Sequence, residues 1–353
     1  MTAKAHRGLT RRRFLGAAAA LATFPAFGAK SEAAPPIGVS GLNHMTLHVS
    51  DVARSLAFYQ KLFGMQVQAR QGETVCLQIG EGPEFMALTP VPPGGAPTLH
   101  HLGLGVPGFE ASAVTARLAA HGLPQAKTGE SLSALHTFAR SRDAAHGGAP
   151  EGTSELYLLD PDGLIVQLQD PLYCGGGGVT GERCEAPPPP QSGPGRIALR
   201  GINHFSIFVS NASRSIEFYQ QVFDLPITKT QGDLPLLDAG EAGQLLAFVD
   251  GGGRIGRPRI HHACVTMEGF QHEDVTSRLA DAGLQPREDP IGAPVAPLST
   301  YVTMRMPDRG GAPGGTPELY FTDPDGILLQ IQDERYCGGS GYLGERCAYL
   351  ATG

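Results

Sequence analysis

The sequence GLNHMTLHVSDVARSLAFYQKLFGMQV occupies residues 41–67, and a second version, GINHFSIFVSNASRSIEFYQQVFDLPI, occupies residues 201–227. In each version the first nine residues alternate between apolar and polar side chains, which is typical of a half-buried strand. The following residues place apolar side chains at helical spacing, with Ser50 or Asp51 able to cap the start and Gly64 able to end the helix. Each version therefore predicts a strand followed by a helix.

The repeat continues along the chain. HHLGLGVPGFEASAVTARLAAHGL at residues 100–123 matches HHACVTMEGFQHEDVTSRLADAGL at residues 261–284. TSELYLLDPDG at residues 153–163 likewise matches TPELYFTDPDG at residues 316–326. Each copy restarts halfway with a second strand and helix, and it closes with a hairpin whose turn is DPDG.

This order, β-α-β-β-β four times over, predicts an α+β fold built from tandem βαβββ units in two modules. We place the first module at residues 41–184 and the second at residues 197–349. The segment between them, residues 185–196, carries a run of prolines that neither a helix nor a central strand accommodates, so we expect it to be a linker.

Composition excludes some partners. The 353 residues carry a net charge of −7 and contain no basic stripe beyond the N-terminal segment, which argues against nucleic acid as a ligand. The hydrophobic fraction of 41% is enough for two packed cores, and the 48 Gly and 29 Pro indicate many turns.

The N-terminal segment resembles an export signal. TRRRFLGAAAALATFPAFGA begins at residue 10 with a twin arginine and continues with small apolar residues. We therefore predict that residues 1–34 hold a twin-arginine signal and the start of the mature chain, and that the protein is periplasmic or secreted. The apolar run is short for a membrane span, although an uncleaved anchor remains the alternative.

The cysteines are patterned in a way that fits an oxidising compartment. YCGGGGVTGERC at residues 173–184 recurs as YCGGSGYLGERC at residues 336–347. We expect each pair to close its Gly-rich loop as a disulfide, with a metal site or free thiols as alternatives. The expected bridges are Cys174–Cys184 and Cys337–Cys347, and Cys76 and Cys264 are predicted to be single thiols.

The opening NHxxxxVxD…S…FY…LFG and the closing LY..DPDG…Q resemble the vicinal oxygen chelate superfamily, which includes glyoxalase I, extradiol ring-cleaving dioxygenases and bleomycin-resistance proteins. The resemblance covers residues 41–172 and 201–335. It implies that the two sheets of βαβββ units curl into cups, with metal ligands projecting inward from the first and last strands. The YCGG…GERC segments are not part of the family pattern.

The resemblance implies a divalent-metal site in each cup, with Fe(II) as the expected ion and Mn or Zn as alternatives. Ala87 and Ala247 stand where glyoxalases carry a further carboxylate ligand, so a three-ligand set like that of the extradiol enzymes fits better. Gln stands at the position of the family's carboxylate, and the alternative is that these His and Gln side chains are buried structural residues. The expected ligands are His44, His101 and Gln167 in the first module and His204, His262 and Gln330 in the second.

Further side chains are candidates for substrate contact. Alternation along the strand places His48 on the same face as His44, which makes it a candidate catalytic residue of the first cup. His100 and His261 are expected to point away from the cups, and Glu155, with its repeat Glu318, to point outward. Tyr157, Tyr320, Arg142 and Arg305 are candidate substrate contacts, with packing for the tyrosines and solvated strand ends for the arginines as alternatives.

The function predicted from the sequence is an exported metalloenzyme resembling extradiol dioxygenases, acting on a small oxygenated molecule. A metal-free binding protein of the same fold is the alternative, because the ligand carboxylate is replaced by Gln. A glyoxalase-like lyase or isomerase is the second alternative. The sequence does not decide the oligomeric state.

Overall fold

The structure is a computed structural model that describes residues 34–127, 130–184, 189–190, 193–240, 243–250, 256–287, 296–348 and 350. Residues 1–33 of the predicted export segment and half of the predicted linker lie outside the described residues. The module boundaries remain predictions.

The predicted order of elements is confirmed in both modules. The first contains β1 (Gly41–Val49), α1 (Val52–Phe63), β2 (Val67–Gln71), β3 (Thr74–Gln78), β4 (Phe85–Pro90), β5 (Thr98–Gly105), α2 (Ala111–Ala120), β6 (Thr137–Arg142), the 3₁₀ helix η1 (Ala144–His146), β7 (Thr153–Leu159) and β8 (Ile165–Gln169). The second contains β9 (Gly201–Val209), α3 (Ala212–Phe223), β10 (Ile227–Gln231), β11 (Leu234–Asp238), β12 (Leu245–Asp250), β13 (Arg259–Met267), α4 (His272–Asp281), β14 (Gln285–Pro286), β15 (Ser299–Arg305), η2 (Pro307–Arg309), β16 (Thr316–Thr322) and β17 (Leu328–Asp333).

Local chemistry explains where the elements begin and end. The Asp51 side chain accepts a hydrogen bond from Arg54 N and caps α1, and Gly64 ends the helix at φ 66°. Along β1 the side chains of Met45, Leu47 and Val49 are buried in the main hydrophobic core. The alternate residues of the strand therefore face the other side of the sheet.

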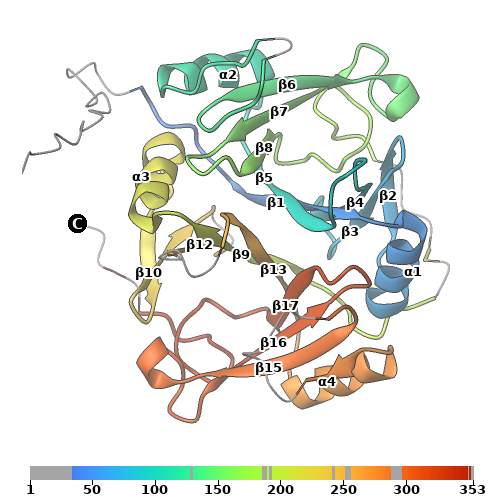
Figure 1. Cartoon of the computed structure of the whole chain (residues 1–353), viewed down its shortest axis with the longest axis vertical. Helices are drawn as coiled ribbons and strands as arrows, with labels where there is room; N and C mark the ends of the chain where they lie inside the picture. Colours follow the sequence, from blue (N-terminus) through green and yellow to red (C-terminus); the bar gives the residue numbers. More distant parts are fainter. Residues whose placement is uncertain are drawn as a thin grey trace, which may run out of the picture. The chain divides into compact units, whose positions relative to one another are not determined.

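Each module forms one mixed sheet in which the first strands of its two halves are neighbours (Figure 1). The strand order is β2-β3-β4-β1-β5-β8-β7-β6 in the first sheet and β10-β11-β12-β9-β13-β17-β16-β15-β14 in the second. Helix α1 packs on β3 and β4, and α2 packs on β6 and β7. This topology brings the central strands β1, β5 and β8 side by side, which is why residues far apart in sequence meet on one face.

The two DPDG turns reverse the chain and also contact the other module. Asp160 forms the turn, because its carboxylate accepts hydrogen bonds from Asp162 N and Leu164 N. Asp162 accepts hydrogen bonds from Ser210 N at 3.0 Å and from Arg214 Nη2 at 2.6 Å, at the start of α3 in the other module. Asp325 makes the reciprocal contacts with Ser50 and Arg54. The repeated turn thus fastens each hairpin to the helix of the other module.

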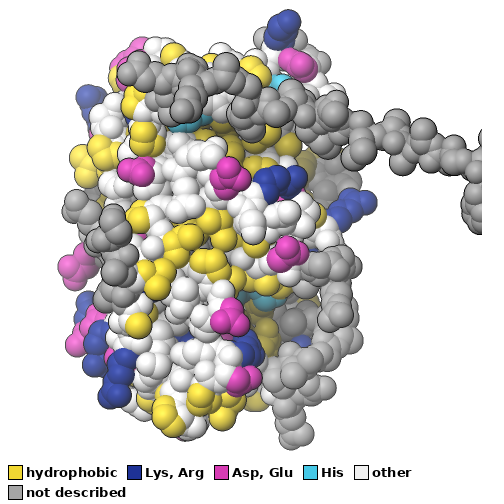
Figure 2. All heavy atoms as spheres, turned by 90° about the vertical axis from the view of Figure 1, so that its left-hand side faces the viewer, with side chains coloured by type: hydrophobic (Ala, Val, Ile, Leu, Met, Phe, Trp, Pro, Cys, Tyr) yellow, Lys and Arg dark blue, Asp and Glu magenta, His cyan; other side chains and the backbone are white. Residues whose placement is uncertain are grey.

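On the face shown in Figure 2, Lys and Arg side chains stand singly or in small groups among Asp and Glu, and an apolar area lies near the centre. Within the described part of the chain, none of the helices has the length and apolar character needed to cross a membrane.

Candidate metal centres

The concave face of each sheet lines a cavity, which we call the first cup and the second cup. The first is about 540 Å³ and the second about 430 Å³. The strand register explains what lies at the centre of the first cup: His44 pairs with Gly103, and Gly103 pairs with Gln167, across three adjacent strands. His101 pairs with Thr46 in the neighbouring row. The three predicted ligands of the first module therefore share one face.

The donor atoms of these three side chains converge. Gln167 Oε1 lies 3.1 Å from His44 Nε2 and 3.0 Å from His101 Nε2. Two donors bound at about 2.1 Å and at right angles on one metal ion lie about 3.0 Å apart. The spacing therefore fits one face of a metal coordination sphere.

A neighbouring amide fixes the tautomer of His44. Asn43 Nδ2 donates to the Tyr173 carbonyl at 2.9 Å, so Asn43 Oδ1 faces His44 Nδ1 at 2.8 Å as an acceptor. His44 Nδ1 must therefore carry a proton, and neutral His44 presents the lone pair of Nε2 to the cup. A ring nitrogen that donates to a second residue while the other nitrogen stays free is the usual arrangement of a metal-binding histidine.

The lone pair of His44 Nε2 faces a carbonyl oxygen, which is also an acceptor. A cation between the atoms removes this conflict, and so does a half-turn of the Gln167 amide that points its NH₂ group at both imidazoles. The amide nitrogen of Gln167 is buried and, among the described residues, has no hydrogen-bond partner, so nothing there resists such a rotation. The site can therefore hold a metal through Oε1 and close on itself through Nε2 when the metal leaves.

The glutamine is essential to the candidate site. No group of three or more His, Cys, Asp or Glu side chains suited to a metal occurs in the described ranges. A set of three protein ligands in either cup would therefore include the amide oxygen.

Gly103 makes room for the His44 ring. A Cβ atom at this position would lie 2.1 Å from Cε1 of His44, so any larger residue would displace the imidazole. Phe85 stacks on the other face of the ring, with centroids 4.6 Å apart. The ring is thus held between a glycine and an aromatic side chain.

The second cup repeats the site with two changes beside the first histidine, since Leu245 occupies the place of Phe85 and Cys264 that of Gly103. Asn203 Nδ2 donates to the Tyr336 carbonyl, and Asn203 Oδ1 accepts from His204 Nδ1 at 2.8 Å. His204 Nε2 lies 3.4 Å from His262 Nε2, and the Gln330 amide nitrogen is again buried without a partner among the described residues. Cys264 occupies the place of Gly103, paired in register with both His204 and Gln330.

Burial keeps the imidazoles neutral. It lowers the pKa of His44 and of His204 to about 4, with the hydrogen bond to Gln167 or Gln330 opposing the shift. Burial and the nearby imidazoles hold the pKa of His101 and of His262 well below the usual value. Neutral imidazoles are the form that binds metal.

Glu155 was predicted to point outward, and this prediction is wrong. The turn between Leu159 and Ile165 has five residues, and this odd number places Glu155 and Tyr157 on the same face as Gln167. Glu155 Oε1 accepts from Arg142 Nε at 2.8 Å and from the Tyr173 hydroxyl at 3.3 Å, and Oε2 accepts from the Tyr157 hydroxyl at 3.1 Å. The carboxylate is therefore already bonded to side chains around the candidate ligands. Glu318 faces its own cup in the same way.

Arg142 and Arg305 are not solvated strand ends. Arg142 is buried, and besides Glu155 it donates to the carbonyls of Gly147 at 2.7 Å and Gly176 at 3.0 Å. Arg305 repeats these contacts with Glu318 and with the carbonyls of Gly310 and Gly339. These donors are engaged within the protein, so the two arginines hold Glu155 and Glu318 in place. Arg142 also lines the first cup, and substrate contact by the two arginines stays a prediction.

His100 and His261 were expected to point away from the cups, but both line them. A bulge in the pairing of β1 with β5 and of β9 with β13 is the reason, since it turns two consecutive residues toward the same side. His100 stacks on His48 with ring centroids 3.8 Å apart, and its Nδ1 lies 2.8 Å from His101 Nδ1. Tyr157, Tyr320 and His48 also line the cups. Substrate contact by the two tyrosines and a catalytic role for His48 stay predictions.

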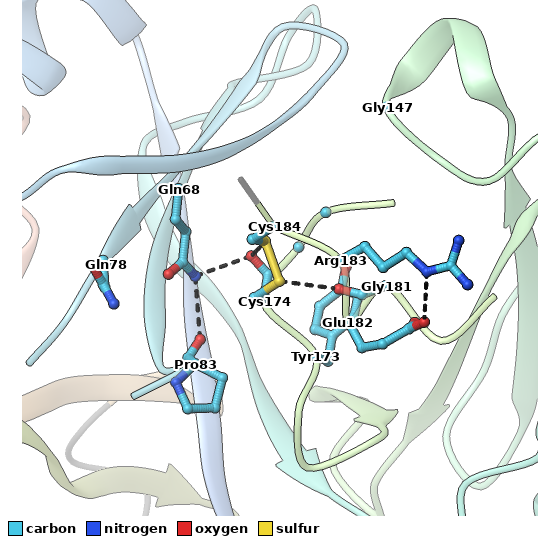
Figure 3. The surroundings of a disulfide bond; sticks show 12 residues. Gln68, Gln78, Pro83, Gly147, Tyr173, Cys174, Gly181, Glu182, Arg183 and Cys184 are labelled. Carbon is cyan, nitrogen blue, oxygen red and sulfur yellow. Dashed lines mark hydrogen bonds and ion pairs between the residues drawn. A yellow bond between two sulfur atoms is a disulfide. The ribbon is translucent and has the colours of Figure 1, made fainter. Parts of the chain in front are cut away.

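Both predicted disulfides are present. Tyr173 and Tyr336, which directly precede the two loops, line the first and the second cup. Figure 3 shows the first bridge, Cys174–Cys184, with Gln68 donating to the carbonyls of Pro83 and Cys174. Tyr173, next to the bridge, lies with its ring 5.6 Å from that of His44. Cys76 and Cys264 are free and buried.

Sequence reasoning missed Asn43, Glu155, Tyr173 and Gly103 as parts of the site. An asparagine in the middle of a strand is unfavourable, and its recurrence at residue 203 was the available signal. The recurring Tyr-Cys-Gly of the loops was a second one.

The role of Asn43 can be tested by paired variants. Asn43→Leu removes the acceptor for His44 Nδ1–H and should lower metal affinity of the first cup by about 10–100-fold. Asn43→Asp retains an acceptor and should lose much less. Equilibrium competition with a metal indicator measures both, and equal losses in the two variants would contradict the tautomer role.

Metal-free protein should lose stability in acid. Among the described residues, seven imidazoles have lowered folded-state pKa values: those of His44, His48, His100, His101, His204, His261 and His262. The unfolded chain binds their protons first as pH falls below about 6.5, so their contribution to stability is lost between about pH 6.5 and 4.

Three buried carboxyls oppose this trend. Burial raises the pKa of Asp160 and Asp323 to about 6 and that of Glu84 to about 7, so they bind protons more readily in the folded state. Because the imidazoles outnumber them, we expect unfolding free energy in EDTA to be lower at pH 5 than at pH 7, by roughly 2–5 kcal/mol. Urea unfolding at the two pH values measures it, and an unchanged or higher value at pH 5 would count against neutral buried imidazoles.

Comparison with known proteins agrees with this architecture. Residues 201–331 match the family Glyoxalase/Bleomycin resistance protein/Dioxygenase superfamily, and residues 42–80 match Bleomycin resistance protein-like N-terminal. A crystal structure of catechol 2,3-dioxygenase is similar with a TM-score of 0.54 and 17% identity, covering 86% of this chain and 93% of that one.

Two further structures show the same likeness. The Mn(II)-bound glyoxalase from Novosphingobium aromaticivorans has a TM-score of 0.55 and 16% identity, covering 84% of this chain and 83% of that one. Homoprotocatechuate 2,3-dioxygenase from Arthrobacter globiformis has a TM-score of 0.55 and 15% identity, covering 90% and 83%. At these identities the likeness establishes the fold alone. The match over residues 201–331, the shorter match over residues 42–80 and the repeated βαβββ sheets make both modules similar to the glyoxalase, bleomycin-resistance and dioxygenase superfamily.

Proposed function

We propose that each cup binds a divalent metal ion through two imidazoles and one glutamine, and that the protein is a metal-dependent enzyme resembling extradiol dioxygenases. The convergence of His44 Nε2, His101 Nε2 and Gln167 Oε1 is the observation that carries this proposal. Similar solved structures include catechol and homoprotocatechuate dioxygenases and a Mn(II)-bound glyoxalase, which supports a metal in this fold.

Two imidazoles and one oxygen donor on one face of a metal are typical of non-haem Fe(II), so Fe(II) is the proposed ion. A bound ion would supply Lewis-acid activation of two adjacent oxygens of a substrate. Because the three protein ligands are neutral, an anionic oxygen on the substrate is favoured.

The protein's own groups would orient the substrate and limit water. The ring of Tyr157 contacts the imidazole of His101, and the ring of Tyr173 contacts that of His44. Glu155 accepts hydrogen bonds from both tyrosine hydroxyls and holds them in place. His48, half-buried at the cup with its pKa lowered by burial, is neutral at pH 7 and is the proposed proton acceptor.

The missing carboxylate favours a second candidate, a protein that sequesters a small molecule without turnover. A glyoxalase-like reaction is less well supported, because Ala87 and Ala247 line the cups where a further ligand would be needed. We also propose export by the twin-arginine route, for which the two disulfides are favourable.

Oxygen uptake tests the enzyme proposal. Protein loaded anaerobically with Fe(II) should consume one O₂ per catechol cleaved and form a yellow ring-opened product. The double variant His44→Ala/His204→Ala is the control. Catechol binding without oxygen uptake would favour the sequestering protein instead, and a lack of metal binding would overturn the metal-dependent enzyme.

A further inference from the structure

The two cups share their candidate ligands but differ at the residues nearer solvent. The repeat aligns these positions one to one, so each residue of the first cup can be compared with its counterpart in the second cup. Polar groups in the first cup are replaced by apolar groups in the second. The pairs are His48 and Phe208, Thr74 and Leu234, and Thr89 and Val249.

The most distinct difference is Arg140, whose counterpart is Thr303. Arg140 lies on β6 opposite Glu155, and Thr303 lies on β15 opposite Glu318, so the two positions are equivalent. Arg140 is exposed and lines the first cup. Thr303 does not carry a charge to the second.

Arg140 stands at the outer end of a row of aromatic rings that begins at a candidate ligand. The His101 ring meets the Tyr157 ring edge-on at 5.7 Å, and Tyr157 stacks on Phe138 at 4.8 Å. The Arg140 guanidinium carbon lies 5.5 Å from the Tyr157 ring centre and 5.4 Å from that of Phe138. A ligand held at His101 and extending along these rings would reach the guanidinium.

The charge of Arg140 is available to a ligand. Among the described residues no carboxylate lies within ion-pair distance of it, in contrast to Arg142, which is bound to Glu155.

The mouth of the second cup has a different charge. Arg309 lines it together with two carboxylates, Asp233 and Asp308. In the first cup the only carboxylates among the described lining residues are Glu155, paired with Arg142, and Asp143, paired with His146 at 2.6 Å. The first cup therefore favours an anion more than the second does.

We propose that Arg140 sets the specificity of the first cup for small oxygenated aromatic ligands that carry a carboxylate at the end remote from His101, and that the second cup takes uncharged ones. This inference rests on the proposed function, because the oxygens at the other end of the ligand are held at the metal centre. The guanidinium of Arg140 would recognise the carboxylate of the ligand through two parallel hydrogen bonds, beside an aromatic ring.

A test of this specificity needs proteins in which one cup alone can bind metal. His204→Ala/His262→Ala leaves the first cup intact, and His44→Ala/His101→Ala leaves the second. Each protein is loaded with zinc, which supports no turnover, and its zinc content is measured. Calorimetric titration then compares 3,4-dihydroxybenzoate with 4-methylcatechol.

In the first-cup protein we expect Arg140→Thr to lower the affinity for 3,4-dihydroxybenzoate at least tenfold. The affinity for 4-methylcatechol should change less than twofold. Arg140→Lys should keep part of the preference, and Arg70→Thr, an exposed arginine on β2, should keep all of it. In the second-cup protein Thr303→Arg should raise the affinity for 3,4-dihydroxybenzoate.

The outcomes separate the two proposals. Zinc bound with an unchanged ratio of affinities in Arg140→Thr would overturn the specificity inference and leave the metal centre standing. Failure of both proteins to bind zinc would overturn the proposed function and this inference with it.

Discussion

Replacing His44 and His101 by alanine should reduce the bound divalent metal from two ions per chain to one. Both variant side chains lack the nitrogen that faces Gln167 Oε1, and the amide oxygen that is left is too poor a donor by itself to retain the ion. The corresponding change at His204 and His262 should remove the other ion, and the fourfold variant should bind none.

Elemental analysis after desalting measures the stoichiometry, and the disulfides give a check on folding because both Cys pairs should stay oxidised. His146→Ala is a matched control, since this exposed histidine lines the first cup but lies outside the candidate ligands. Two ions retained in the fourfold variant would place the metal elsewhere.

Gln167→Glu should tighten metal binding in the first cup by at least tenfold, about 1.4 kcal/mol. The substitution keeps the shape of the side chain and adds a negative charge to a neutral ligand set. It removes no hydrogen bond, because the amide nitrogen of Gln167 has no partner among the described residues. The same reasoning applies to Gln330 in the second cup.

Without metal, the Gln167→Glu protein should have a lower free energy of unfolding than the wild type, because it buries a carboxylate beside neutral imidazoles. The pair of measurements, indicator competition for affinity and urea unfolding in EDTA for stability, distinguishes a ligand from a packing residue. Gln167→Met is the matched control without a good donor. Equal affinities for wild type, Gln167→Glu and Gln167→Met would show that this position does not bind metal.

Much of the fold follows from the repeated motif alone. The strand–helix unit at residues 41–67, the second helix and the DPDG hairpin all have the predicted order, because alternation, capping residues and turn residues act locally. The resemblance also located the strands that carry His44, His101 and Gln167.

Features that depend on pairing between strands were harder to predict. The side of the sheet on which Glu155 lies depends on whether the DPDG turn has an odd or an even number of residues, and the bulge beside His100 breaks the alternation on which its predicted orientation relied. Asn43 could be assigned a role only when the Tyr173 carbonyl was seen to orient its amide. Such contacts join residues 130 positions apart, and no local pattern encodes them.

Titration of zinc into metal-free protein with ¹⁵N-labelled histidine tests the metal centres most directly. The four imidazoles of His44, His101, His204 and His262 should shift at Nε2, with saturation at two zinc ions per chain. His44 and His204 should keep the Nδ1–H tautomer throughout, because Asn43 and Asn203 accept that proton. A spectrum in which zinc leaves these four Nε2 signals unchanged would contradict the account.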